Sequence, residues 1–142
     1  MRKTTFVSAL AMLVLASFLV VPGAHAGATY ALPVIVYTVN FSGGSYIYAE
    51  GTFSDTRSSS DTTSYMRCGL NYNQGWTTPT GYCSAYSATT GEYAYCYTTD
   101  PPAIQVIASM KDDSLIEFEH YTNSSTCSFV SSEEYSGVAP KK

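Results

Sequence analysis

The stretch "YCSAYSATTGEYAYCYTT", residues 82–99, contains two runs in which tyrosine or serine alternates with alanine or cysteine, separated by Thr-Thr-Gly. Alternation with a period of two is typical of a β-strand that has one buried face. The glycine, Gly91, favours a tight turn because it adopts the left-handed backbone conformation without steric cost. The stretch therefore predicts a β-hairpin.

The pairing register of this hairpin decides where its tyrosines lie. If Cys83 lies opposite Cys96, the loop is the two-residue Thr89-Thr90, and five tyrosines share one face: Tyr82, Tyr86, Tyr93, Tyr95 and Tyr97. A three-residue loop ending at Gly91 shifts the pairing by one residue and places the two cysteines on opposite faces. We favour the first register, and the second stays open.

All four cysteines lie after the predicted signal peptide, at Cys68, Cys83, Cys96 and Cys127. An even number of cysteines in an exported protein is typical of disulfides, so we expect two. A zinc site needs closely spaced ligand pairs, whereas these gaps are 15, 13 and 31 residues. The first register pairs Cys83 with Cys96, which is the arrangement we favour; in the second, Cys83 pairs with Cys68 or Cys127.

The flanking sequence continues the β pattern. Residues 32–41 and 45–53 predict a hairpin about Ser-Gly-Gly, residues 62–73 predict a further strand, and residues 114–122 and 125–131 predict a last hairpin. The fold class we expect is all-β: a small antiparallel sandwich or strongly twisted sheet of six to eight strands, with two disulfides.

One short helix is expected at 101–110. In "DPPAIQVIASMK", residues 100–111, Asp100 or Thr99 can cap the helix, and two prolines fit its first turn, where their missing donors would be unpaired anyway. The polar stretch "SDTRSSSD", residues 54–61, is expected to be a loop.

The chain begins with the features of a secretory signal peptide. A basic start is followed by an apolar run and by the small residues Ala24 and Ala26, which suit a peptidase, so we assign residues 1–26 to the signal and 27–142 to one domain with a frayed C-terminal tail. The apolar run is shorter than the roughly 20 residues of a permanent span, so no membrane span is expected in the mature chain. We expect a secreted or periplasmic location and, from the short leader, a bacterial source.

The charge of the mature chain disfavours nucleic acid as a partner. Five basic and eleven acidic residues leave a formal net charge of −6, and phosphate neutralisation needs clustered lysine and arginine. Thirteen tyrosines take the place of missing aliphatic residues, and with many serines and threonines they favour an ordered β protein over disorder.

Few residues suggest catalysis. His120 is the one histidine after the signal peptide, and Glu117 and Glu119 alternate with apolar residues as on a half-buried strand. A hydrolase using Asp or Glu with His120 is therefore the third hypothesis. Asp55 and Asp61 could supply oxygens to calcium, but Arg57 between them is the more obvious partner for either carboxylate. We predict no metal and no cofactor.

The tyrosines of residues 82–99 carry the leading hypothesis. Tyrosine offers a rigid ring with a polar tip and is common on binding surfaces. The chain is therefore expected to be a non-enzymatic exported module that binds a carbohydrate or another cell-surface component through a tyrosine-rich sheet face. The alternative is self-association into a matrix or fibre by edge-strand pairing.

Several segments resemble a group of small exported bacterial proteins with four cysteines. They are "YAEGTFSDTRSSSD", "YMRC", "GYCSAYSATTGEYAYC", "AIQVIASM" and "SSTCSF", and together they span most of the mature chain. The resemblance implies export and a shared disulfide-bearing β fold, and it implies no activity.

Overall fold

Seven strands form two antiparallel sheets in the part of the chain that the computed structural model describes, residues 31–75 and 77–134. The predicted signal peptide lies outside the described residues, as do residues 135–142 of the predicted frayed tail. The elements are β1 (Ile35–Phe41), β2 (Gly44–Gly51), α2 (Phe53–Ser58), β3 (Tyr65–Asn71), β4 (Thr80–Ser87), β5 (Glu92–Thr98), α3 (Pro101–Ser109), β6 (Leu115–Tyr121) and β7 (Cys127–Glu133).

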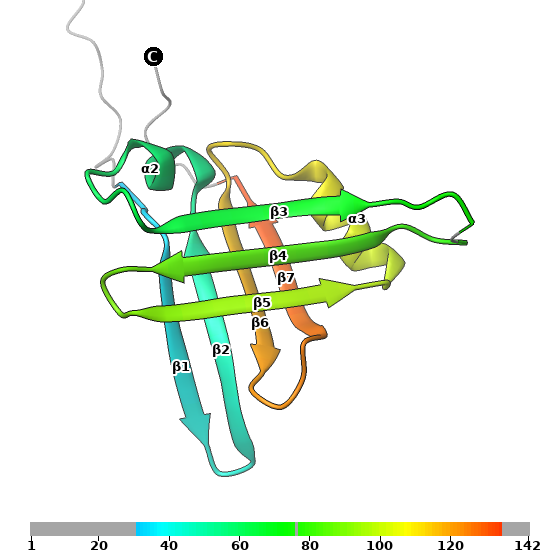
Figure 1. Cartoon of the computed structure of the whole chain (residues 1–142), viewed down its shortest axis with the longest axis horizontal. Helices are drawn as coiled ribbons and strands as arrows, with labels where there is room; N and C mark the ends of the chain where they lie inside the picture. Colours follow the sequence, from blue (N-terminus) through cyan, green and yellow to red (C-terminus); the bar gives the residue numbers. More distant parts are fainter. Residues whose placement is uncertain (1–30, 76, 135–142) are drawn as a thin grey trace, which may run out of the picture.

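The two sheets pack face to face, with strand order β1-β2-β6-β7 in one and β3-β4-β5 in the other. The strands of the three-stranded sheet run across those of the four-stranded sheet (Figure 1). The predicted all-β sandwich with two disulfides is confirmed, and the three predicted hairpins are β1-β2, β4-β5 and β6-β7.

The core lies between the sheets and is made by alternate residues of each strand. Phe118, Ile116 and Val36 are fully buried from the four-stranded side, where they face Ala85 and Ala94. The small side chains of β4 and β5 allow the bulky ones to approach their backbone closely, and this complementarity fills the interior. The alternation in residues 82–99 thus has its apolar side inward.

The register of the β4-β5 hairpin is the one that we favoured. Cys83 lies opposite Cys96, and Tyr82 lies opposite Tyr97. Both predicted loop lengths are wrong, however, because the loop has four residues, 88–91, between the pair Ser87 and Glu92. Gly91 has a φ of 73°, in the left-handed region, and its N–H donates to the Ser87 carbonyl at 2.8 Å. A four-residue loop has the same parity as a two-residue loop, so it keeps the predicted faces.

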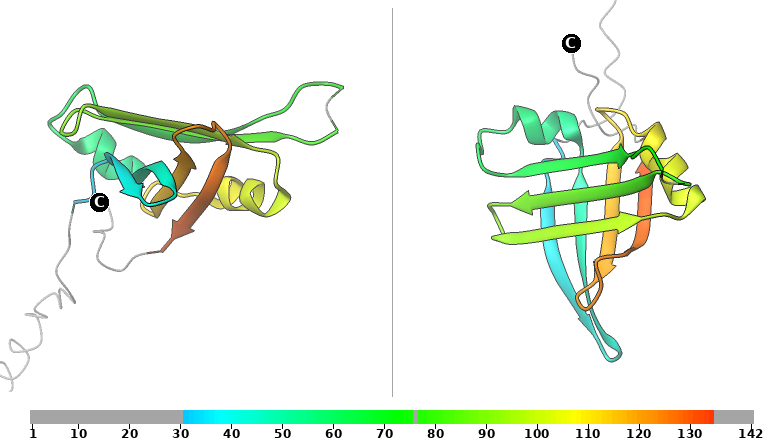
Figure 2. Two further views of the ribbon diagram at one scale, coloured as in Figure 1. Left: turned by 90° about the horizontal axis from the view of Figure 1, so that it is seen from below. Right: turned by 45° about the vertical axis from the view of Figure 1, so that its right-hand side comes forward.

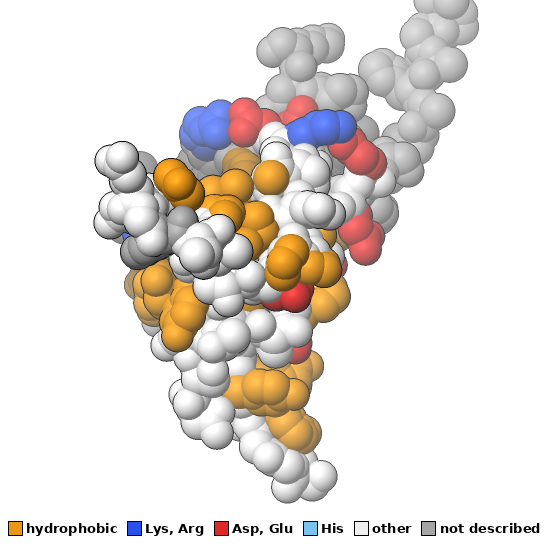
Figure 3. All heavy atoms as spheres, turned by 90° about the vertical axis from the view of Figure 1, so that its right-hand side faces the viewer, with side chains coloured by type: hydrophobic (Ala, Val, Ile, Leu, Met, Phe, Trp, Pro, Cys, Tyr) orange, Lys and Arg blue, Asp and Glu red, His pale blue; other side chains and the backbone are white. Residues whose placement is uncertain are grey.

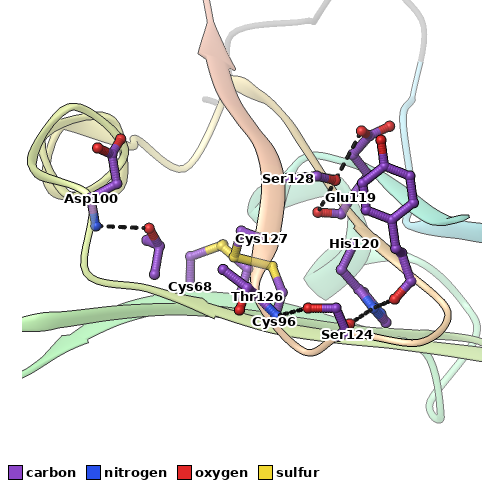
Figure 4. The surroundings of a disulfide bond; sticks show 12 residues. Cys68, Cys96, Asp100, Glu119, His120, Ser124, Thr126, Cys127 and Ser128 are labelled. Atoms are coloured by element: carbon purple, nitrogen blue, oxygen red, sulfur yellow. Dashed lines mark hydrogen bonds between the residues drawn. A yellow bond between two sulfur atoms is a disulfide. The ribbon is translucent and has the colours of Figure 1, made fainter.

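The predicted Cys83–Cys96 disulfide is wrong. One bond is Cys68–Cys83, which joins β3 to β4. The other is Cys96–Cys127, which joins the two sheets, and Figure 4 shows its surroundings. Cys83 has a cysteine directly opposite it on each neighbouring strand, and it bonds to Cys68, with the two Cα atoms 4.1 Å apart. Cys96 instead meets Cys127, which arrives from β7 with the Cα atoms 4.9 Å apart. The expected link between disulfide partner and register is therefore also wrong.

The predicted loop at 54–61 begins as a helix, α2. Thr52 caps it by accepting from the Asp55 N–H at 3.0 Å, as expected for an N-cap threonine. The Thr56 hydroxyl is buried, donates to the Thr52 carbonyl at 2.7 Å and accepts from the Val34 N–H at 3.0 Å. Tertiary hydrogen bonds thus stabilise a helix in a polar stretch whose composition alone favours a loop.

The predicted helix at 101–110 is confirmed as α3. Asp100 accepts from the Ala103 N–H at 3.3 Å, and the prolines occupy the first two helical positions. The buried Ile107 packs on β4 at Gly81, where an added Cβ would lie 2.7 Å from the Ile107 Cδ1 atom. Glycine at this position allows α3 to lie against the end of the three-stranded sheet.

Candidate functional site

The outer side of the three-stranded sheet carries six tyrosines and one arginine. On β4 and β5 the outward positions include the five tyrosines that the sequence singled out, and β3 adds Tyr65 and Arg67. We call this surface the tyrosine face; its residues are Tyr65, Arg67, Tyr82, Ser84, Tyr86, Tyr93, Tyr95 and Tyr97.

No described element covers the tyrosine face. Figure 2 shows α2 and α3 on the same side of the three-stranded sheet as the other sheet, so they flank the core and leave the opposite side open. The three tyrosines of β5 are exposed accordingly, with Tyr95 at 38% and Tyr93 at 48%. Exposed aromatic side chains grouped on one surface are typical of binding sites.

The rings of the tyrosine face lie in rows across the strands. Tyr65 lies opposite Tyr86 with ring centroids 6.5 Å apart, and Tyr86 lies opposite Tyr93. Burial, followed by the effect of the nearby Tyr65, raises the pKa of Tyr93. Aromatic pairs of this kind stabilise a sheet surface and also hold the rings in fixed positions.

Tyr82 lies over Gly69. A Cβ added at Gly69 would lie 3.0 Å from the Tyr82 hydroxyl oxygen and 3.2 Å from its Cζ atom. The ring of Tyr82 therefore occupies space that the side chain of any residue other than glycine at position 69 would fill. This close approach keeps the ring of Tyr82 low on the sheet, which makes this part of the tyrosine face flat.

Arg67 lies in the same surface. Its Nε donates to the Ser84 hydroxyl at 2.9 Å, and its guanidinium carbon is 5.9 Å from the centroid of the Tyr65 ring. Ser84 is fully buried although it lies on the outer side of β4, so neighbouring side chains cover it. A guanidinium held by a hydroxyl and a ring has fewer conformations than a free surface arginine.

The outer side of the four-stranded sheet is also rich in tyrosine, but it carries carboxylates. We call it the acidic face; its residues are Tyr37, Tyr46, Tyr48, Glu50, Glu117, Glu119, Tyr121 and Phe129. Figure 3 shows lysine, arginine and most of the visible carboxylates toward the upper end of the molecule, with exposed hydrophobic side chains below them.

Hydrogen bonds within the acidic face join tyrosine to glutamate. Glu50 lies directly opposite Glu117, and the Tyr48 hydroxyl donates to the Glu117 carboxylate, which also accepts from Ser131 at 2.7 Å. Burial, followed by the nearby Glu117, raises the pKa of Glu50. Burial and the hydrogen bond to Glu117 raise the pKa of Tyr48 well above its usual range. The pairing of Glu50 with Glu117 is absent from the sequence-based predictions because it depends on the non-local pairing of β2 with β6.

The candidate hydrolytic residues do not form one site. Glu117 and Glu119 point outward on β6, whereas His120 points inward and is 8% exposed; Figure 4 shows Glu119 and His120 on opposite sides of the strand. The Nδ1–H of His120 donates to the Tyr121 and Ser124 carbonyls at 2.9 and 2.8 Å. Its Nε2 is buried without a hydrogen-bond partner among the described residues. The histidine is therefore held in place by the β6-β7 turn.

The carboxylates of the polar stretch 54–61 accept hydrogen bonds from neighbouring parts of the chain. Arg57 pairs with Asp112 at 3.2 Å, a partner that the sequence-based prediction did not include. Asp55 accepts from the Leu32 N–H at 2.9 Å. Hydrogen bonds from the Ser64 and Thr63 side chains and backbone lower the pKa of Asp61 below its usual range. Within residues 31–75 and 77–134, no group of three or more histidine, cysteine, aspartate or glutamate side chains could hold a metal ion.

The edge of β5 is partly covered. The Tyr97 N–H donates to the Ser125 carbonyl at 2.9 Å, and Tyr97 forms a parallel bridge with Thr126. A strand of another copy cannot pair with these groups while the β6-β7 loop occupies them. This arrangement gives no support to fibre formation through the β5 edge.

The sequence identified five of the six tyrosines but missed Tyr65 and Arg67. The alternation in "YMRC" already separates Tyr65 and Arg67 from Met66 and Cys68, and this signal predicts that both point away from the cysteine-lined core. The alternation does not predict the pairing of β3 with β4, and this pairing brings Tyr65 and Arg67 beside the hairpin tyrosines.

Comparisons of the chain with protein-family models, with curated proteins and with solved structures find no match. The resemblance to exported bacterial four-cysteine proteins stays a prediction. No helix within the described residues is long and apolar enough to cross a membrane. The two disulfides are typical of a protein that folds outside the cytoplasm.

Proposed function

We propose that the protein is an exported, non-enzymatic module that binds a polysaccharide on its tyrosine face. The observation that carries this proposal is the gathering of six tyrosines on one sheet surface that no described element covers. Tyrosine rings present a flat apolar surface on which the C–H faces of sugar rings can pack, and their hydroxyl groups can bond to sugar hydroxyls.

The rigidity of the surface supports the same proposal. The Cys68–Cys83 disulfide joins two of the three strands directly behind the tyrosine face, and Cys96–Cys127 ties the third to the other sheet. Side chains on strands that cannot shift relative to one another lose little conformational freedom when a ligand binds. Secreted and periplasmic locations both agree with disulfides and with a polysaccharide ligand.

The arrangement of the rings suits an extended polymer. Tyr93, Tyr95 and Tyr97 follow one another on one side of β5, so neighbouring rings are about 7 Å apart along the strand. Such a row offers repeated contacts of similar chemistry, which suits a chain of linked sugars.

A matched pair of variants tests the proposal. Tyr95 and Tyr37 are almost equally exposed, at 38% and 37%, but they lie on the tyrosine face and the acidic face respectively. In affinity electrophoresis through gels containing soluble neutral and acidic polysaccharides, we expect at least one polymer to retard the wild type. Tyr95→Ala should weaken that binding by about two- to tenfold, the range for one aromatic contact, and Tyr37→Ala should leave it unchanged.

The proposal is wrong if none of the polymers retards the wild-type protein. It is also wrong if the two variants weaken binding equally, because the effect would then not belong to the tyrosine face. Thermal unfolding of both variants shows whether each still folds.

A further inference from the structure

Arg67 is the one charged residue of the tyrosine face among the residues that the structure describes. The protein as a whole is acidic, with a sequence pI of about 4.9. The opposite surface, the acidic face, carries three glutamates. The two outer surfaces of the sandwich therefore differ in the sign of their charge.

Arg67 also differs from the other cations with described partners. Arg57 pairs with Asp112 and Lys111 pairs with Glu134. No carboxylate within the described chain pairs with Arg67, whose contacts are the neutral Ser84 and Tyr65. Ser84 binds Nε, which leaves the two terminal nitrogens of the guanidinium group with no described partner. These nitrogens provide two parallel donors that match a carboxylate.

A hollow of about 410 Å³ lies beside Arg67 at the edge of the tyrosine face. It lies between α2 and β3, and its lining includes Arg57, Ser64 and Tyr65 but no carboxylate. The hollow therefore offers space beside Arg67 for an anionic group.

We infer that the polysaccharide bound by the tyrosine face is anionic and carries carboxylate groups, as uronic acid polymers do. The inference rests on the proposed function and names its ligand class. The tyrosine rings pack on the sugar rings, and the Arg67 guanidinium binds one carboxylate through its two terminal nitrogens.

The single cation distinguishes this ligand from other polyanions. Nucleic acid carries a phosphate at every nucleotide, and anionic membranes attract clusters of lysine and arginine, so both need several cations on the binding surface. A polymer whose carboxylates are separated by uncharged ring faces needs many ring contacts and few cations. The tyrosine face has this ratio, with six tyrosines to one arginine.

A pair of polymers with the same backbone tests the inference. Polygalacturonate and its fully methyl-esterified form share one backbone, and in the ester each carboxylate is replaced by a neutral methyl ester. The wild type should bind polygalacturonate about tenfold more tightly than the ester, and Arg67→Gln should lose that preference, because a charge-assisted hydrogen-bonded pair contributes about a factor of ten or more. Arg67→Lys, which keeps the charge but loses the paired donors, should give an intermediate affinity.

Lys111→Gln is the matched control, because it removes one positive charge from an exposed residue that lies outside the tyrosine face. It should bind both polymers as the wild type does. The inference is overturned if the wild type binds both polymers equally and Arg67→Gln has no effect while Tyr95→Ala still weakens binding; the proposed function would then stand with a neutral ligand.

If neither these polymers nor any other of the gel panel retards the wild type, the proposed function fails and the inference falls with it. Sedimentation of the wild type in the absence of polymer completes the test, with a monomer expected. An oligomer that Arg67→Gln dissociates would assign the tyrosine face to a second copy of this chain and overturn the inference.

Discussion

The tyrosine face and the acidic face are built from the same kinds of residue, yet their hydroxyl groups have different partners. On the acidic face Tyr48 donates to Glu117, and Tyr37 packs against Tyr48 with ring centroids 5.2 Å apart. On the tyrosine face no described residue forms a hydrogen bond with the Tyr95 or Tyr97 side chain. A tyrosine-rich strand alone therefore does not indicate a binding surface, and the partners of each hydroxyl must be known.

The two faces also differ in their charged residues and in the partners of those residues. On the acidic face Glu117 accepts a hydrogen bond from the Tyr48 hydroxyl, and burial, followed by the nearby Glu117, raises the pKa of Glu50. Arg67 on the tyrosine face has only neutral partners among the described residues. We therefore expect side-chain changes to affect mainly stability on the acidic face and mainly binding on the tyrosine face.

Removing a tyrosine hydroxyl group should destabilise the protein more on the acidic face than on the tyrosine face. Tyr48→Phe should lower the free energy of unfolding by about 1 kcal/mol, because Glu117 loses a hydrogen bond in a partly buried position. Tyr95→Phe should change it by less than about 0.5 kcal/mol, as is usual for surface substitutions. Urea unfolding followed by fluorescence measures both. Equal losses would show that the two faces do not differ in the way described.

Removing the charge of Glu50 should change the stability of the protein by a smaller amount, and this change should depend on pH. Because its pKa is raised in the folded state, the stability contributed by Glu50 is fully present below its ordinary value of 4.5 and is lost as the pH rises through the folded-state pKa. Glu50→Gln should therefore melt higher than the wild type at pH 7, by on the order of 2 °C after allowance for solvent screening.

This difference should disappear as the pH falls to about 4, which thermal unfolding at several pH values would show. Glu133→Gln removes an equal charge from an exposed end of β7 and serves as the control. A Glu50→Gln variant that is less stable than the wild type at pH 7 would contradict the assigned environment of Glu50.

Local patterns in the sequence predicted the three hairpins and the faces of their residues. The alternation about Gly91 placed five tyrosines correctly even though the loop length was wrong, because two- and four-residue loops give the same faces. Asp100 and the prolines after it predicted α3, since capping depends on neighbours in the chain.

Features that depend on distant residues were not predicted. The sequence does not show that Cys83 meets Cys68 across the β3-β4 pair, or that Cys127 reaches Cys96 from the other sheet. The helix α2 is stabilised by the hydrogen bond between Thr56 and Val34, which are 22 residues apart. Arg67 joins the tyrosines only through the pairing of β3 with β4, so the sequence did not predict the one charged residue of the tyrosine face as the structure describes it.

Backbone amide NMR spectra during titration with oligogalacturonate test the central claim most directly, because they report on both faces in one experiment. Shift changes should concentrate at β3, β4 and β5, with Arg67 and Tyr95 among the largest, and should be small at Tyr48 and Glu119 of the acidic face. Changes centred on β2 and β6 instead, or no changes in a protein that the polymer retards in gels, would contradict the assignment of binding to the tyrosine face.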